Sequence, residues 1–97
     1  MAQASNDEAG RAPVEGLPVS FAEFLVSLGT TALVHLGEIP DPAEGRVKRN
    51  LPLARHGIDV LRMLREKTAG NLDGDESRLI SALIDDLESK YRAVRAG

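Results

Sequence analysis

Apolar residues recur at intervals of three and four in three separate stretches of the chain, the spacing of helices that bury one face. This pattern predicts helices at about 20–36, 51–69 and 74–94. A connector with proline and glycine, residues 38–50, separates the first two helices, and a short polar turn separates the last two. The sequence has no β-hairpin signal. The expected fold class is all-α, a three-helix, hairpin-like bundle.

Capping residues support these helix boundaries. Ser20, Asn50 and Asp73 stand where an N-cap is expected, and a glutamate follows the first and the third of them three residues later. Gly37 and Gly70 stand just after the first and second helices, where a left-handed residue commonly ends a helix.

The chain is short, and its core is expected to be thin. Residues 1–18 are small, polar and charged, which predicts a disordered N-terminal arm and leaves residues 19–95 as a single helical domain. The 97 residues include two Phe, one Tyr and no Trp. Because aromatic rings supply much of the area that a core buries, so few of them suggest help from a partner.

No targeting or membrane segment is evident. Residues 1–18 lack the cationic start and apolar run of a secretory signal. The longest apolar stretch without a charge, Phe24–Leu36, is shorter than the roughly 20 residues of a membrane span. We therefore expect a cytoplasmic protein that has no membrane partner.

The first predicted helix is apolar on nearly every face, because Val26, Leu33 and Val34 lie outside its main apolar stripe. Such a helix is normally covered on more than one side, and the end of the long third helix is expected to overhang the bundle. Both features favour a homodimer over an intrachain core alone. The expected interface residues are Phe21, Phe24, Leu25, Leu28, Ala32, Tyr91 and Val94.

Charge is uneven along the chain, although the net charge is only −3. Residues 46–67 carry seven basic side chains against two acidic ones, and residues 73–88 carry six acidic side chains against one basic. The acidic third helix can neutralise the remaining basic charge by packing beside the second helix or beside its symmetry mate. Within the second helix, basic and acidic side chains alternate at helical spacing, which predicts a ladder of ion pairs. Its members are Arg55, Asp59, Arg62 and Glu66.

The basic residues before the second helix suggest an alternative function, the binding of an anion. A helix N-terminus attracts anions, so this segment could bind a small anion, a nucleotide or a nucleic acid. The residues concerned are Arg46, Lys48 and Arg49. Nucleic acid is the least favoured of these ligands, because the net charge is negative and stacking aromatic residues are scarce.

The sequence offers no set of residues for catalysis or for metal binding. A catalytic metal site needs three protein ligands, whereas the chain has two histidines, His35 and His56, and no cysteine. The acidic stretch that begins at Asn71 is not a calcium loop, because Glu76 and Ala82 occupy the positions that require glycine and glutamate. We expect no enzymatic activity, no metal and no cofactor.

One segment is more specific than a generic helix. Residues 58–72 follow the pattern Ile-Asp-x-Leu-x-Met-Leu-x-x-Lys-Thr-x-Gly-Asn-Leu, after Leu36-Gly37-Glu38 and Pro40-Asp41-Pro42. Over about residues 19–92 the chain closely resembles the bacterial family known as domain of unknown function 1844. The resemblance implies a short cytoplasmic helical protein and carries over no activity, cofactor or catalytic residue.

We interpret the most specific part of that pattern as structural. The glycine supplies a turn conformation, the asparagine can bond to local backbone, and the leucine returns to the core. The lysine complements the helix dipole, and the threonine can bond to a carbonyl one turn back. These residues are Lys67, Thr68, Gly70, Asn71 and Leu72. The expected function is thus a non-enzymatic, homodimeric module for protein interaction or regulation.

Overall fold

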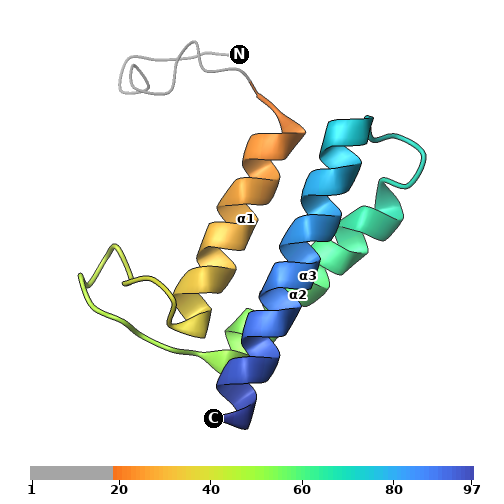
Figure 1. Ribbon diagram of the computed structural model, residues 1–97. Helices are drawn as coiled ribbons and strands as arrows, with labels where there is room; N and C mark the ends of the chain where they lie inside the picture. The colour runs from red at the N-terminus through yellow and green to blue at the C-terminus, as the bar shows by residue number, and fades with distance from the viewer. Residues whose placement is uncertain (1–18) are drawn as a thin grey trace, which may run out of the picture.

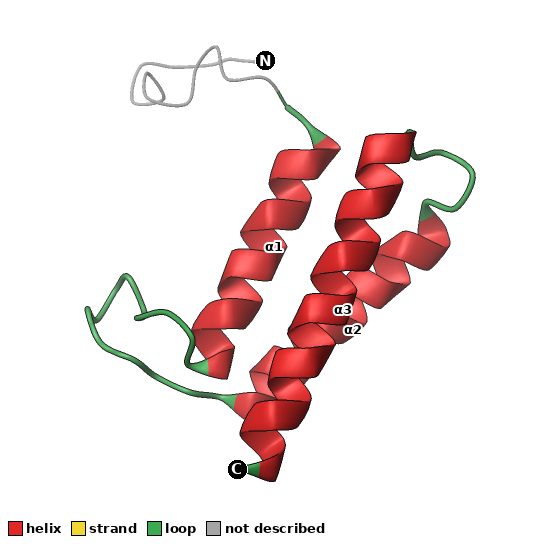
Figure 2. Cartoon of the chain, in the orientation of Figure 1, coloured by secondary structure: helices red, strands yellow, loops and turns green. Residues whose placement is uncertain are grey.

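The computed structural model describes residues 19–97, and in this range it contains three helices. Helix α1 spans Phe21–Leu36, α2 spans Leu51–Lys67 and α3 spans Gly74–Ala96. Figure 1 shows α2 running antiparallel to its two neighbours, and each helix contacts both of the others. The segments that join the helices are loops (Figure 2). The all-α, three-helix fold is confirmed, and the predicted arm lies outside the described residues.

Side chains cap the start of every helix. Ser20 Oγ accepts a hydrogen bond of 3.0 Å from a backbone amide of α1, and Asn50 Oδ1 accepts one of the same length from α2. At the start of α3, Asp73 and Glu76 exchange both hydrogen bonds of a capping box, at 2.8 and 3.0 Å. Each cap satisfies amides that the helix cannot pair by itself.

The helix ends lie close to those expected from the glycines. Gly37 follows α1 with a φ of 82°, and Gly70 has a φ of 87° in the turn after α2, both in the left-handed region that favours glycine. Helix α2 ends at Lys67, two residues before the end of the expected range, and α3 continues to Ala96, two residues beyond its expected end.

The core between the helices is entirely aliphatic. Its buried residues are Leu25, Ala32, Val34, Leu36, Ala54, Ile58, Leu61, Ile80, Ile84 and Leu87. Leu25 and Ala32, which are 0% and 1% exposed, were expected at an interface with a second copy. Both pack in the core of the single chain, since their stripe on α1 faces the other helices, and Ala32 also lines a groove between α1 and α2.

Small residues let α1 approach both of its neighbours closely. A Cβ atom placed on Gly57 of α2 would lie 3.5 Å from the Cβ of Ala32, and one placed on Gly29 would lie 3.1 Å from Cδ2 of Leu83. The first contact sets the register of α1 against α2, with Ala32 beside Gly57.

The connector, residues 38–50, is anchored to the end of α1. The backbone amide of Asn50 donates a hydrogen bond of 2.8 Å to the carbonyl of His35. Arg49 Nε donates one of 3.3 Å to the carbonyl of Leu36, a group that the helix itself leaves unpaired. The start of α2 is therefore held beside the end of α1.

Candidate interaction surface

An apolar groove runs between α1 and α2. Its volume is about 280 Å³, and each of the two helices contributes four residues to its lining. These residues are Leu28, Thr31, Ala32 and His35 from α1, and Leu53, His56, Gly57 and Val60 from α2. The two imidazoles are the ionisable groups among them, and neither a carboxylate nor a lysine or arginine from the described part of the chain lines the groove.

Two exposed apolar side chains occupy positions that continue this lining along each helix, and one of them, Met63, also lines a second hollow beside Asp59 and Arg62. Phe24 lies one turn before Leu28 on α1 and is 49% exposed, and Met63 lies three residues after Val60 on α2 and is 44% exposed. Phe24 also contacts Phe21, with ring centroids 6.3 Å apart. We call the groove together with Phe24 and Met63 the α1/α2 face.

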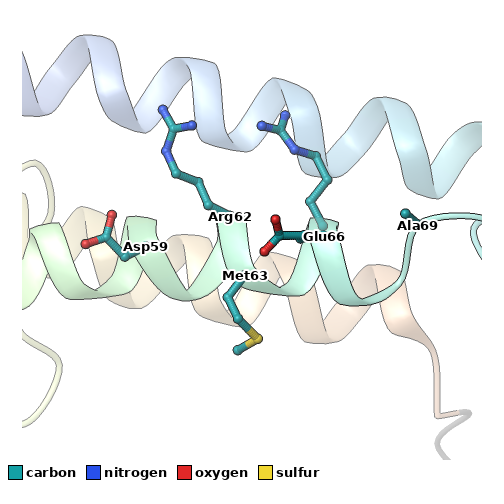
Figure 3. Close-up of a pocket in the computed structure, with 6 residues that line it drawn as sticks. Asp59, Arg62, Met63, Glu66 and Ala69 are labelled. Atoms are coloured by element: carbon teal, nitrogen blue, oxygen red, sulfur yellow. The ribbon is translucent and has the colours of Figure 1, made fainter.

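The two sides of α2 differ in chemistry. Figure 3 shows Arg62 reaching toward α3, whereas Met63 points away from it. Arg55 and Arg62 of α2 thus contact the acidic helix through Glu88, whereas Leu53 and Val60 line the groove. Sequence reasoning placed the interface on α1 and α3 and omitted α2, although Leu53, Val60 and Met63 recur at helical spacing beside the main apolar stripe.

The contact between α2 and α3 is built on Glu88. This carboxylate, with 12% of its side chain exposed, forms salt bridges with Arg55 at 2.7 Å and with Arg62 at 2.6 Å. The hydrogen bond from Arg55 is the main cause that lowers the pKa of Glu88 to about 2. One acidic side chain of α3 thus pairs with two basic side chains of α2. Within the ladder expected on α2, Arg55 pairs with Asp59 at 3.0 Å.

A second hollow lies on the outer side of α2, with a volume of about 630 Å³, and Figure 3 shows its residues. Oppositely charged groups, Asp59 and Glu66 against Arg62 and Arg65, share its lining. Arg62 is already paired with Glu88, and Arg65 donates a hydrogen bond of 3.3 Å to Ser81 on α3. This mixture of charges, partly bound within the chain, does not select a ligand.

The connector's basic residues have partners within the chain. Glu44 accepts Arg46 at 3.1 Å and Lys48 at 2.7 Å, and this contact raises the pKa of Lys48. The third residue, Arg49, donates to the carbonyl of Leu36. The structure thus brings the three expected anion ligands into one loop but gives each of them an intrachain contact.

Tyr91 and Val94 lie on α3, away from the lining of the groove. Tyr91 is half-buried against the core, and the guanidinium carbon of Arg55 lies 4.9 Å from its ring centroid. Arg95 approaches the same ring at 5.8 Å. The residues expected at one interface are therefore divided among the α1/α2 face, the core and the end of α3.

The segment interpreted as structural forms the turn between α2 and α3. Thr68 Oγ1 donates a hydrogen bond of 2.7 Å to the carbonyl of Leu64, one turn back, and Gly70 adopts the left-handed conformation. The amide of Asn71 donates to the carbonyl of Thr68, and Leu72 packs against the core. Lys67 is exposed in the last turn of α2.

Residues 19–97 lack two further features. These residues contain no group of three or more histidine, cysteine, aspartate or glutamate side chains that could hold a metal ion. None of the three helices is both long and apolar enough to cross a membrane.

A family model, described as domain of unknown function (DUF1844), matches residues 18–93. The chain belongs to this family. The DUF1844 match covers α1, α2, both connecting loops and all but the last turn of α3, so the α1/α2 face lies wholly within it. The curated proteins and the solved structures that were searched contain no match.

Proposed function

We propose that this protein is a non-enzymatic cytoplasmic module that forms a homodimer and acts in protein interaction or regulation. The observation that carries the proposal is the α1/α2 face, an apolar groove flanked by the exposed side chains of Phe24 and Met63. Water-exposed apolar groups that adjoin one another favour an interface.

The composition of the face favours a second copy as its occupant. The segment Phe24–Leu36 carries no aspartate, glutamate, lysine or arginine, in a chain in which such residues make up 28%. Interface centres are depleted in charge in the same way. A two-fold interface places each surface against itself, so a charged surface would repel its own copy, and a neutral surface does not.

The size of the face suits a dimer of moderate affinity. Helices of 16 and 17 residues are about 24 and 26 Å long, and a packed pair is about 20 Å wide. The face therefore covers on the order of 500 Å² per copy, or about 1,000 Å² in a dimer, near the lower bound for specific interfaces. We expect a dissociation constant in the micromolar range.

Sedimentation equilibrium at micromolar concentrations tests this proposal. Phe24→Glu places a carboxylate from each copy in the interface and should weaken the dimer by about 10- to 100-fold, as for the loss of an interface anchor. Val26→Glu is the matched control, because Val26 is 50% exposed and lies about 160° from Phe24 around α1. The control should dimerise like the unmodified protein. A monomer of the unmodified chain, or equal weakening by both variants, would contradict the proposal.

Anion binding through Arg46, Lys48 and Arg49 is the alternative proposal. It has less support, because a ligand would have to displace the contacts with Glu44 and with the carbonyl of Leu36. Thermal-shift measurements with phosphate and nucleotides test it. A stabilisation larger than that caused by sodium chloride at the same ionic strength would favour it.

A further inference from the structure

The only two histidines of the chain both line the α1/α2 groove. They come from different helices, His35 from the last turn of α1 and His56 from α2. His35 is half-buried and His56 is exposed. A second copy that covers the groove would therefore cover both imidazoles.

The packing register directs the two histidines toward each other. Ala32 lies beside Gly57, so His35 comes three residues after this contact on α1, and His56 comes one residue before it on α2. A helical side chain leans toward the N-terminus of its own helix. Because the two helices are antiparallel, His35 and His56 lean toward one another along the groove.

Most charged groups near the histidines have contacts with other residues. On α2, Arg55 and Asp59 flank His56 and form a salt bridge, and Arg55 continues to Glu88 on α3. After α1, the exposed Glu38 lies three residues beyond His35, and Lys90 of α3 is paired with Asp86 at 2.7 Å. On the connector, the Arg49 guanidinium contacts the carbonyl of Leu36. Among the described residues, no salt bridge joins a carboxylate to either imidazole.

We propose that pH controls the dimer through His35 and His56. This inference rests on the proposed homodimer. Neutral imidazoles fit an apolar interface, whereas each imidazolium would bring a charge into it, and two copies would bring together four such charges. Histidine is the side chain that ordinarily changes its charge between about pH 5 and pH 8.

The direction follows from proton linkage. The dimer binds fewer protons than the separated monomers, because burial disfavours the charged imidazoles. The same linkage that relates proton binding to folding then makes association strong at neutral pH and weaker as the pH falls. The protein is thus a dimer at about pH 7.5 and increasingly a monomer toward about pH 5.5.

Sedimentation equilibrium at these two pH values, at constant ionic strength and with EDTA to remove bound metal, tests the inference. On acidification, the dissociation constant of the unmodified protein should rise at least tenfold. A tenfold rise corresponds to a loss of about 1.4 kcal/mol in the free energy of association. The double variant H35Q/H56Q keeps a polar side chain without a titrating group, and its dissociation constant should change less than about twofold.

The outcomes separate this inference from the proposed function. A dimer of equal strength at both pH values, or a double variant as pH-sensitive as the unmodified protein, would overturn the role of the histidines and leave the dimer standing. A monomer at about pH 7.5 would overturn both. Circular dichroism should show the same helix content at both pH values, and loss of helix at the lower one would overturn the inference by assigning the change to unfolding.

Discussion

Glu88 on α3 accepts two hydrogen bonds from Arg55 on α2, at 3.0 and 2.7 Å. The two residues are 33 positions apart in the sequence, and the pair connects the C-terminal half of α3 to the first turns of α2. Arg62, two turns further along α2, binds the same carboxylate. One carboxylate thus contacts two arginines that lie two turns apart on α2. Its removal is therefore expected to weaken the packing of α3 against α2.

Glu88→Gln should lower the free energy of unfolding by about 1–3 kcal/mol, because both arginines lose a charged acceptor in a partly buried site. Urea unfolding followed by circular dichroism at neutral pH measures the loss. Asp85→Asn, on an exposed position of the same helix, is the control and should change stability by less than about 0.5 kcal/mol. Equal effects of the two changes would show that the pairing at Glu88 contributes nothing specific.

The same pair predicts how stability depends on pH. The arginines lower the pKa of Glu88 from 4.5 to about 2. A carboxyl whose pKa is lower in the folded state stabilises the fold fully above its unfolded value and loses this contribution as the pH falls through the folded value. The difference between the unmodified protein and Glu88→Gln should therefore be constant above about pH 5 and shrink toward pH 2. Urea titrations across this range measure it, and a difference that persists at pH 2 would contradict the assignment.

Two helical glycines should respond differently to alanine. At Gly57 the new Cβ would make an ordinary contact of 3.5 Å with Ala32, so Gly57→Ala should raise the stability of the monomer by about 0.5–1 kcal/mol through helix propensity. At Gly29 the new atom would lie 3.1 Å from Leu83, so the crowding should cancel most of that gain. Thermal unfolding at low protein concentration compares the two, and a larger gain at Gly29 would refute the packing described here.

Adjacent residues on α1 should show how the structure divides core from surface. Leu25→Ala removes a fully buried side chain and should cost about 2–5 kcal/mol, enough to unfold a domain of marginal stability. Phe24→Ala removes a larger side chain that is 49% exposed, and its cost in the monomer should be below about 1.5 kcal/mol. Urea unfolding at low protein concentration measures both changes. A larger loss of stability for Phe24→Ala than for Leu25→Ala would contradict the burial of Leu25 in the core and favour a place for it at an interface.

The sequence by itself determined the three helices, with their ends to within two residues. These features depend on residues within one or two turns of each other, as in the capping box of Asp73 and Glu76 and the left-handed turn at Gly70. The acidic and basic segments also predicted that α3 would lie against α2. The charges allowed the second helix of the same chain or of a symmetry mate, and the structure shows the pairing within the chain, through Glu88 with Arg55 and Arg62.

Only the tertiary structure decided which apolar side chains the chain buries for itself. On α1, whose faces are nearly all apolar, the pattern could not separate Leu25, in the core, from Phe24, on the surface. The groove depends on the register that places Ala32 beside Gly57, a contact between residues 25 positions apart that no local spacing encodes. Packing geometry, which depends on the shapes of all three helices together, brought His35 and His56 into that one groove.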